Sequence, residues 1–451
     1  MREVSVQVGD RIRLRLDSLA AGGEAVGRYA GMAVFVLFGC PGDEVETEVT
    51  EVGGRFARAA LREVVTPSRD RATPPCPHFG ECGGCQLQHV SYPAQLREKT
   101  AMVRDALARV GELPEVPVGE IWGMGHPWHY RNQARYHASL MPSGELALGF
   151  ARYHTREVLA LQECRVQHAL SERVRLALLE LFPRHAQTGE ERAALLGLET
   201  LVSFASREVI AILVCDRRPS FLRSLAEALM ERVPGLAGVS AAQARGRMAV
   251  HRSPSEAVVG RRHLEERLGD REYGISPDAF FQGNPEQAAR LVALVEEWAD
   301  VQPGETVLDL YSGVGTFLLP LARRARRAAG VESERGAVAQ ARANAQTWGL
   351  TSTTFYERRV ERFLPRLSER GWQPDVVVLD PPRKGCGPLV CAAVARLRPR
   401  RVVMVSCHPA TLARDLKCLA ERGYVPRQVQ PLDVFPHTWH VEAVARCDRA
   451  A

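Results

Sequence analysis

Residues 307–317 read VLDLYSGVGTF, in which an apolar run carries Asp309 and is followed by Gly313 and Gly315. The run predicts a buried strand, and the glycines stand where the chain must turn into a helix. Glycines in such a turn let a ligand approach the backbone at the carboxyl end of the strand. Their spacing is not G-x-G-x-x-G, which argues against a dinucleotide. A tight turn with no ligand remains the alternative interpretation of the glycine pair.

The same alternation of short apolar strands and helical patterns continues to the C-terminus. Glu332 ends the strand-like AAGVE, where a carboxylate can accept both hydroxyls of a ribose, and Asp380 ends DVVVLD before two prolines. Alternating strands and helices predict an α/β domain with a doubly wound, mostly parallel sheet. Acids at three strand ends of one sheet are the typical layout of S-adenosylmethionine-dependent methyltransferases.

The 451 residues exceed one compact core, so we expect several domains. Residues 1–66 carry strand patterns broken by glycines and predict a small antiparallel barrel, and TPSRDRATPP (66–75) has the composition of a linker. We place a central α+β domain at 67–270 and the methyltransferase-like domain at 271–451.

Composition sets limits on partners and compartment. The net charge of +6 is too small to require nucleic acid, and no apolar run is long enough to span a bilayer. The N-terminus alternates polar and apolar residues like a strand and unlike a signal peptide. We therefore expect a cytoplasmic protein, and a monomer because no heptad pattern is present. In a reducing compartment its eleven cysteines favour metal binding or catalysis over disulfides.

Two groups of residues have side chains suited to chemistry. Cys76, Cys82 and Cys85 crowd into CPHFGECGGC, where a metal, a redox role, disulfides or nucleophilic attack are all open. Cys407 ends the strand-like RVVMVS before a helix, whose dipole would lower its pKa, although a small buried hydrophobe is an equal alternative. Glu442 lies in the apolar run HVEAVA and needs a partner or a role, unless it faces water on an edge strand.

Together these segments resemble the bacterial RNA uracil-C5 methyltransferases, specifically the iron-sulfur-containing 23S rRNA branch with an N-terminal TRAM domain. The resemblance spans essentially the whole chain, through CPHFGECGGCQLQH, FFQGN, DLYSGVGTF, LDPPRKG, SCHPATLARD and FPHTWHVE in the family's order. It implies Cys407 as nucleophile and Glu442 as general base. It also implies a set of residues that contact S-adenosylmethionine: Gln282, Tyr311, Thr316, Glu332 and Asp380.

The resemblance further implies a 4Fe-4S cluster held by Cys76, Cys82, Cys85 and Cys164. Zinc is the alternative, but a zinc site of four cysteines commonly has a second C-x-x-C pair, which is missing here. Some residues depart from the family pattern: Thr316 replaces a frequent asparagine, Ser312 a cysteine and Trp439 a glycine. Arg359 stands near the expected adenine position in place of a short polar residue.

The implied reaction is covalent catalysis on uracil, whose C5 is a poor nucleophile. The Cys407 thiolate adds to C6, the resulting enolate takes the methyl group at C5, and Glu442 removes the C5 proton before the thiolate leaves. The uridine must leave its stack, and Phe280 can replace the lost stacking. The expected partner is 23S rRNA, with tRNA as the alternative. The TRAM-like barrel offers phosphate contacts through Arg11, Arg13, Arg28, Arg55 and Arg58, all of which are equally suited to a solvated surface.

Competing functions remain within and outside this enzyme class. An RNA cytosine-C5 or adenine-N6 methyltransferase is one, although Arg383 stands where the aromatic residue of an amino methyltransferase would follow DPP. A radical S-adenosylmethionine enzyme is disfavoured, because its C-x-x-x-C-x-x-C spacing differs from this chain's five-residue first gap. A non-catalytic RNA-binding protein that keeps the fold is the alternative outside enzymes.

Overall fold

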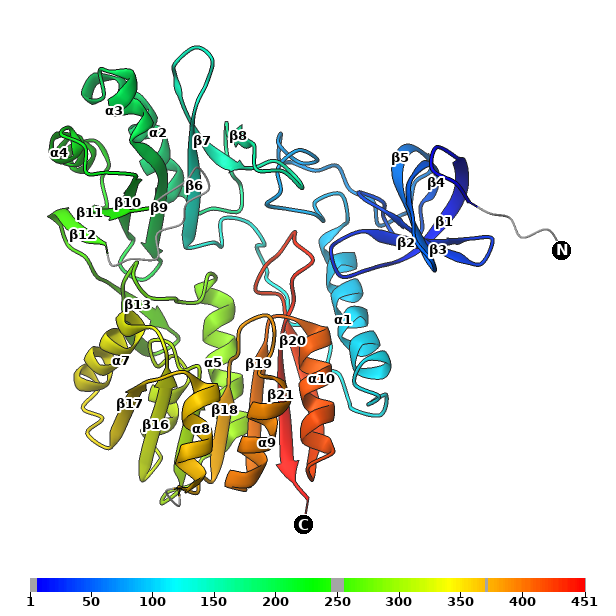
Figure 1. The fold of residues 1–451 in the computed structure, drawn as a ribbon, viewed down its shortest axis with the longest axis vertical. Coiled ribbons are helices and arrows are strands. Elements are labelled where there is room, and N and C mark those ends of the chain that lie inside the picture. The colour runs from blue at the N-terminus through cyan, green and yellow to red at the C-terminus, as the bar shows by residue number, and fades with distance from the viewer. Residues whose placement is uncertain (1–5, 245–254, 370–371, 451) are drawn as a thin grey trace.

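A computed structural model describes residues 6–244, 255–369 and 372–450 of the chain. Three β-structures are arranged around a junction of loops and one long helix (Figure 1). A closed barrel holds the N-terminal residues, a seven-stranded sheet follows in the middle of the chain, and a second seven-stranded sheet holds the C-terminal part. Among the described residues, no helix combines the length and apolar composition needed to cross a bilayer.

The C-terminal sheet has the strand order β17-β16-β15-β18-β19-β21-β20. The first five strands in this order pair in parallel, and β21 lies antiparallel between β19 and β20. The predicted doubly wound, mostly parallel sheet is therefore confirmed. Its strands are β15 (Thr306–Leu310), β16 (Arg327–Glu332), β17 (Thr353–Glu357), β18 (Val376–Leu379), β19 (Arg401–Ser406), β20 (Tyr424–Leu432) and β21 (Glu442–Arg449).

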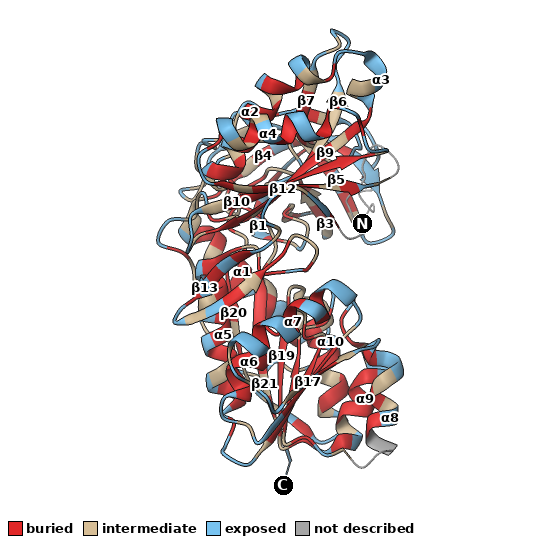
Figure 2. Ribbon diagram, turned by 90° about the vertical axis from the view of Figure 1, so that its left-hand side faces the viewer, coloured by how far each residue is buried: buried red, intermediate tan, exposed pale blue. Residues whose placement is uncertain are grey.

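Helices cover both faces of this sheet because its central strands are apolar on both sides. Along β18, Val376 and Val378 pack into one hydrophobic cluster while Val377 and Leu379 pack into the other. Figure 2 shows these buried strands in red between two helical layers. One layer contains α5 (Pro285–Ala299), α6 (Leu318–Ala322) and α7 (Arg335–Thr347), and the other contains α8 (Val360–Glu369), α9 (Gly387–Leu397) and α10 (Pro409–Ala420).

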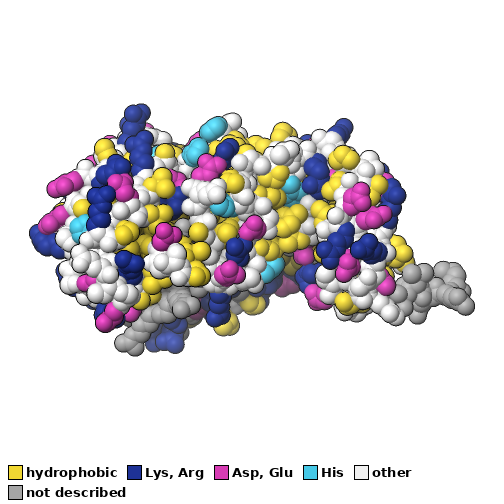
Figure 3. Space-filling model, turned by 90° about the horizontal axis from the view of Figure 1, so that it is seen from above, with side chains coloured by type: hydrophobic (Ala, Val, Ile, Leu, Met, Phe, Trp, Pro, Cys, Tyr) yellow, Lys and Arg dark blue, Asp and Glu magenta, His cyan; other side chains and the backbone are white. Residues whose placement is uncertain are grey.

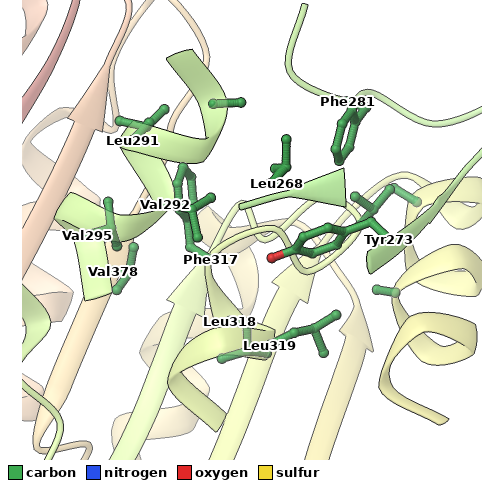
Figure 4. Packing of buried hydrophobic residues seen from close by; sticks show 14 of the residues in the cluster. Leu268, Tyr273, Phe281, Leu291, Val292, Val295, Phe317, Leu318, Leu319 and Val378 are labelled. Carbon is green, nitrogen blue, oxygen red and sulfur yellow. The ribbon is translucent and has the colours of Figure 1, made fainter. Parts of the chain in front are cut away.

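A small hairpin closes the layer that contains α5. Figure 4 shows Leu268 and Tyr273 of the hairpin near Phe281, with Leu291 and Val292 of α5 to their left. Phe281 is thereby fixed in the core at the start of the FFQGN segment, close to the carboxyl ends of the parallel strands. The hairpin consists of β13 (Leu264–Leu268) and β14 (Arg271–Ile275).

The N-terminal barrel is closed in the order β1-β2-β3-β5-β4. Buried and exposed residues alternate along Arg11–Leu19, so one face fills the barrel and the other meets solvent. The expected barrel is confirmed, but its pairing is not wholly antiparallel because β3 and β5 run parallel. Residues 1–5, which belong to the expected N-terminal strand pattern, lie outside the described residues. The strands are β1 (Arg11–Leu19), β2 (Ala25–Tyr29), β3 (Met32–Val36), β4 (Glu44–Val52) and β5 (Phe56–Thr66).

The central sheet has the order β12-β11-β10-β9-β6-β7-β8, with helices packed on one hydrophobic cluster. It is antiparallel except between β10 and β11. Its strands are β6 (Gln133–Leu140), β7 (Leu146–Ala151), β8 (Val158–Ala160), β9 (Leu195–Ser203), β10 (Glu208–Cys215), β11 (Leu236–Gln243) and β12 (Glu256–Gly260). Its helices are α2 (Ala169–His185), α3 (Gly189–Ala193) and α4 (Leu222–Arg232).

The long helix α1 (Tyr92–Arg109) connects the barrel to the C-terminal sheet. The carboxylate of Glu98 accepts the backbone N–H of Leu19 in the barrel at 3.0 Å, while Val103 and Leu107 join the cluster beneath α9 and α10. The segment with linker composition is also held in place, since the Arg71 guanidinium pairs with buried Asp43 at 2.6 Å. The barrel is thus anchored to the rest of the chain by polar and apolar contacts.

Candidate active site

A cavity of about 900 Å³ opens at the carboxyl ends of β15, β16, β18 and β19. From β15 the chain builds β16 and β17 on one side and then returns to add β18 on the other side. Ligands of open α/β sheets bind at such a switch point. The cavity lining contains both expected catalytic residues and all five expected cofactor residues: Gln282, Tyr311, Thr316, Glu332, Asp380, Cys407 and Glu442.

The glycine-rich turn after β15 shapes the floor of this cavity. Gly313 and Gly315 have positive φ values of 52° and 86°, and Tyr311 adopts the same left-handed region at 65°. A side chain at Gly315 would come within 3.0 Å of Leu319, so this turn also needs glycine for packing. Left-handed backbone at the non-glycine Tyr311 is strain of the kind that is retained at ligand sites.

Glu332 is oriented at the end of β16 by backbone donors. Its carboxylate accepts the N–H of Gly313 at 3.1 Å and that of Glu334 at 2.8 Å. These bonds fix the carboxylate toward the cavity, where its remaining lone pairs can accept two hydroxyl groups of a ribose.

Asp309 does not present its carboxylate to the cavity, contrary to the expectation of three acids at the edge. Its side chain is fully buried within β15 and does not line the cavity. Burial raises the pKa of Asp309 well above its usual range, and the carboxylates of Asp380 and Glu332 raise it further. Burial and the two neighbouring carboxylates therefore favour the protonated form of Asp309.

The remaining cofactor candidates come from separate segments. Gln282 is buried and follows Phe281, and its backbone carbonyl accepts a hydrogen bond from Asn132 at 3.1 Å. Tyr311 donates its hydroxyl to Glu361 at 3.2 Å, and the carbonyl of Thr316 accepts the hydroxyl of Tyr273 at 3.0 Å. The bonds to the carbonyls of Gln282 and Thr316 hold the backbone at these two residues and so fix where their side chains begin.

Two further carboxyls line the cavity, that of Glu442, which is buried, and that of Asp380, which is half-buried. Burial raises the pKa of Asp380 to about 7, and the Glu332 carboxylate adds to that rise. Burial also raises the pKa of Glu442 well above its usual range, with Asp380 contributing and the Arg383 guanidinium opposing. A carboxylate whose pKa is raised accepts a proton more readily, as a general base requires.

Cys407 follows β19 and precedes α10, as expected, but its pKa moves opposite to the expectation. Burial raises the pKa of the Cys407 thiol to about 11, and Glu442 and Asp380 add to the rise while Arg383 lowers it. Loss of hydration and two nearby carboxylates therefore outweigh the helix N-terminus. The thiol is protonated at neutral pH, and its reactivity depends on removal of that proton.

Arg383 is a cavity residue whose role in the site was not predicted from the sequence. It follows the two prolines of the β18 loop, and its charge lowers the pKa of both Cys407 and Glu442. Its guanidinium also lies 3.1 Å from Nε2 of His440, a residue of the segment that precedes Glu442. The sequence contains a signal for this role, because Arg383 follows Asp380 by three residues and a cation at this sheet edge is a natural counterion for Asp380 and Glu442.

The four expected metal-binding cysteines also lie together. Cys76, Cys82, Cys85 and Cys164 line a second cavity of about 570 Å³, with apolar walls that include Phe150, Leu161 and Val166. The Nε2 atom of His78 accepts the backbone N–H of Gln162 at 2.9 Å and joins the two cysteine-bearing loops. In the described part of the chain, no three of these four sulfurs lie within 4.8 Å of one another.

The cysteine loop is bonded directly to the segment that carries Glu442. The backbone N–H groups of Gln86 and Leu87 both donate to the carbonyl of His437, at 3.0 and 2.9 Å. The ring of His437, which has a positive φ of 65°, stacks on Trp128 at 3.8 Å. The loop that lines the second cavity thus holds the backbone of the segment that leads to Glu442 in the first cavity.

Comparisons with known proteins agree with this architecture. The family model described as tRNA (Uracil-5-)-methyltransferase matches residues 91–448. The chain is 36% identical over 450 residues to an uncharacterised RNA methyltransferase of Caldanaerobacter subterraneus subsp. tengcongensis, covering 98% of this chain and 99% of that one. It is also 36% identical over 445 residues to an uncharacterised RNA methyltransferase of Thermosynechococcus vestitus, covering 97% and 98%.

A solved structure shares the fold across the same length. The crystal structure of Pyrococcus abyssi tRNA (uracil-54, C5)-methyltransferase in complex with S-adenosyl-L-homocysteine superimposes with a TM-score of 0.75. The two sequences are 27% identical, and the match covers 97% of this chain and 100% of that one. The span matched by the family model and the identity to full-length relatives lead to one assignment: the chain belongs to the RNA (uracil-5-)-methyltransferase family, whose members use S-adenosylmethionine.

Proposed function

We propose that this enzyme methylates C5 of one or more uridines in 23S rRNA through a covalent adduct between Cys407 and uracil C6. The observation that carries the proposal is the single cavity in which Cys407, Glu442 and the five cofactor candidates meet. S-adenosylmethionine supplies an electrophilic methyl group there.

The roles of the chain's own groups follow from their surroundings. The Cys407 thiol gives up its proton to solvent in the cavity and its sulfur then adds to C6, which makes C5 nucleophilic. After C5 has gained the methyl group, Glu442 takes the C5 proton and the Cys407 sulfur leaves C6 as the double bond reforms. The raised pKa of Glu442 suits it to accept that proton, and Arg383 stabilises the negative charges on Cys407 and Glu442.

The side chain of Phe280 supports access by a base that has left its stack. It is 66% exposed and lines both the cofactor cavity and the cysteine cavity. An exposed aromatic ring that borders both cavities is placed to contact a ligand that enters either of them. Stacking on an extruded base or on its neighbour would be such a contact.

A tRNA uridine is the second candidate substrate, favoured by the similarity to the Pyrococcus abyssi tRNA (uracil-54, C5)-methyltransferase and by the tRNA family model. Mapping 5-methyluridine in 23S rRNA and in tRNA from a deletion strain separates the two. We expect 23S rRNA to lose a modification that the wild-type gene restores and Cys407→Ala does not. Loss confined to tRNA would replace the rRNA assignment.

The N-terminal barrel is proposed to bind RNA as a TRAM-like module. Figure 3 shows Lys and Arg side chains on this barrel, at the right, interspersed with Asp and Glu. Arg13 and Arg58 pair with carboxylates of the barrel itself, Glu44 for the former and Glu24 and Glu51 for the latter. Arg11, Arg28 and Arg55 make no ion pair with any described residue, which leaves their charges available to phosphates.

Cys76, Cys82, Cys85 and Cys164 are proposed to hold a 4Fe-4S cluster. A single zinc ion with Zn–S bonds of about 2.3 Å needs sulfurs about 3.8 Å apart, whereas a cluster of four irons needs a wider set of thiolates. The wide spacing of these cysteines, their apolar walls and their bonds to the His437 loop suit a cluster that stabilises the approach to the active site.

The metal is tested on anaerobically purified protein. We expect brown protein with visible charge-transfer absorption and four irons per chain, and Cys164→Ala should abolish both. Colourless protein carrying stoichiometric zinc on these cysteines would overturn the cluster.

We also propose the division into a barrel (1–66), a cluster-bearing central domain (67–270) and a methyltransferase domain (271–451). The barrel and the two seven-stranded sheets support it, but the boundary at 270/271 falls inside the β13–β14 hairpin, which packs as a whole with α5. Helix α1 belongs to the central segment by sequence but packs on α10, so we expect the second and third domains to unfold together.

A further inference from the structure

A second group of thiols lies between α9 and α10, on the opposite side of β18 and β19 from α5 (Figure 1). Cys386 precedes α9, Cys391 lies in its second turn, and Asp415 and Cys418 lie one turn apart on α10. All four are buried, and the proposed methyl transfer uses none of them.

The ligand atoms in this group are close together. The sulfurs of Cys386 and Cys391 are 3.6 Å apart, and Oδ2 of Asp415 is 3.4 Å from the sulfur of Cys386. All three ligand atoms lie within 4.8 Å of one another, which holds for no other group of three His, Cys, Asp or Glu residues in the described part of the chain. The Cys418 thiol lies one turn along α10 from Asp415 but is not within 4.8 Å of all three ligand atoms, so it would have to move toward them to complete a set of four.

The separations among the three atoms of Cys386, Cys391 and Asp415 match those between three of the four ligands of a tetrahedral zinc ion. Zn–S bonds of about 2.3 Å and a Zn–O bond of about 2.1 Å place two sulfurs about 3.8 Å apart and a sulfur and an oxygen about 3.6 Å apart. Three thiolates with one carboxylate are donors that suit zinc, and a buried tetrahedral set with no place for water is typical of structural sites.

The surrounding charges complete the coordination chemistry. Three thiolates and one carboxylate around Zn²⁺ leave two negative charges. Arg414 donates to Oδ1 of Asp415 at 2.8 Å, and Arg422 donates to the sulfur of Cys418 at 3.1 Å, so two guanidinium groups balance them. Two further donors, the backbone N–H groups of Cys386 and Gly387, orient the Asp415 carboxylate.

We propose that Cys386, Cys391, Asp415 and Cys418 form a structural zinc site. Binding releases the three thiol protons to solvent and leaves the metal redox-inert. The site would tie the turn at Gly385, which follows Asp380 and Arg383 in the β18 loop, to α10, which follows Cys407. Zinc would thereby fix the two loops that bear the active-site residues at one separation.

The proposal is tested by X-ray absorption at the zinc edge on the full-length protein, reconstituted with Zn²⁺ under reducing conditions. We expect about one zinc per chain with three sulfurs at about 2.3 Å and one oxygen at about 2.0–2.2 Å. No bound zinc, or zinc with four sulfurs only, as the Cys76 group would give, would overturn it.

Variants provide an independent measurement. Cys391→Ala and Cys418→Ala should each lower bound zinc at least about tenfold while iron content is kept. The matched control is Cys215→Ala, a buried cysteine of β10 outside both cysteine groups, which should keep its zinc. Zinc that stays unchanged in both α9 and α10 variants would contradict the site, and the wild-type spectrum decides if a variant fails to fold.

Discussion

At the scale of single residues, the candidate active site combines the buried Glu442 and the half-buried Asp380 with a thiol whose pKa is raised. The pKa of Asp380 is raised to about 7 and that of Cys407 to about 11, in both cases chiefly by burial. Arg383 is the cation that opposes these shifts at Cys407 and Glu442. The chemistry therefore depends on deprotonation within the cavity and not on a preformed thiolate.

This electrostatic arrangement predicts the pH dependence of the free enzyme. The thiolate of Cys407 and the carboxylate of Glu442 are both the deprotonated forms of groups whose pKa is raised, so both reactive forms increase with pH. We expect log kcat/KM for methyl transfer to rise steadily from about pH 7 to about pH 9. Rapid-quench assays with labelled methyl donor measure it, and a plateau that begins below pH 7 would mean that the thiolate exists in the resting enzyme.

Glu332 predicts a second residue-level outcome. Hydrogen bonds to a charged carboxylate contribute about 1.5–3 kcal/mol each, so Glu332→Gln should weaken cofactor binding about 10- to 100-fold. Titration calorimetry with S-adenosylhomocysteine measures the affinity. Glu357→Gln is the matched control, because Glu357 lies opposite Glu332 in the register of β17 against β16 but does not line the cavity. Equal affinities of the two variants would remove Glu332 from the cofactor site.

Sequence reasoning succeeded at this scale where residue type and strand end together define a position. Glu332, Asp380 and Cys407 follow apolar strands, so their convergence could be expected from parallel-sheet topology alone. The sign of the Cys407 shift and the burial of Asp309 could not, because desolvation depends on the side chains packed around each group from distant segments.

At the scale of elements, the loop between β20 and β21 is the part of the site that depends most on other segments. The Nζ atom of Lys99 in α1 donates to Asp433 at 2.6 Å and to the carbonyl of Phe435 at 3.0 Å. Both charged side chains are fully buried. This pair fixes the start of the loop that leads to His437 and Glu442.

Removing one partner of such a pair leaves an uncompensated buried charge. Lys99→Met should therefore lower the free energy of unfolding by about 3–5 kcal/mol. Lys417→Met, which breaks the exposed pair between Lys417 and Glu112, is the control and should cost less than about 1 kcal/mol. Urea titration followed by tryptophan fluorescence compares the two variants. Equal losses of unfolding free energy would show that the buried Lys99–Asp433 pair stabilises the protein no more than the exposed pair does.

Elements with strict periodicity could be predicted from the sequence. The alternation in RIRLRLDSL defines β1 from Arg11 to Leu19, and the apolar runs define β15, β18 and β19. The parallel pairing of β3 with β5 and the packing of α1 on α10 could not be predicted, because both join segments that local pattern does not relate.

At the scale of the whole molecule, the barrel, the central sheet and the methyltransferase sheet meet near the two cavities. Phe280 lines both cavities, and the cysteine loop is bonded to the segment before Glu442. An RNA bound across the barrel could thus reach the cofactor cavity past the cysteine loop. The order of the three parts along the chain could be predicted from the sequence pattern. Their arrangement in space could not, because it depends on contacts between distant segments, such as the hydrogen bond from Leu19 of the barrel to Glu98 of α1.

RNA binding by the barrel predicts a change in salt dependence. Each lost phosphate contact reduces the slope of log affinity against log salt by about 0.7–0.9, so Arg11→Gln with Arg55→Gln should reduce it by about 1.4–1.8. Arg13→Gln with Arg62→Gln is the control, because both arginines pair with Glu44 and Glu48 on the barrel. Filter binding to an rRNA fragment measures the slopes, and equal slopes for the two double variants would exclude Arg11 and Arg55 from the RNA interface.

The proposed reaction depends on the addition of the Cys407 sulfur to uracil C6 and on the removal of the C5 proton by Glu442. The most direct measurement is mass spectrometry of enzyme–RNA complexes that survive denaturing conditions, with wild type, Glu442→Gln and Cys407→Ala incubated with RNA and S-adenosylmethionine. We expect Glu442→Gln to accumulate a covalent adduct carrying the transferred methyl group, and Cys407→Ala to form neither adduct nor product. Full methylation by Cys407→Ala, or a Glu442→Gln enzyme that turns over like wild type without an adduct, would contradict it.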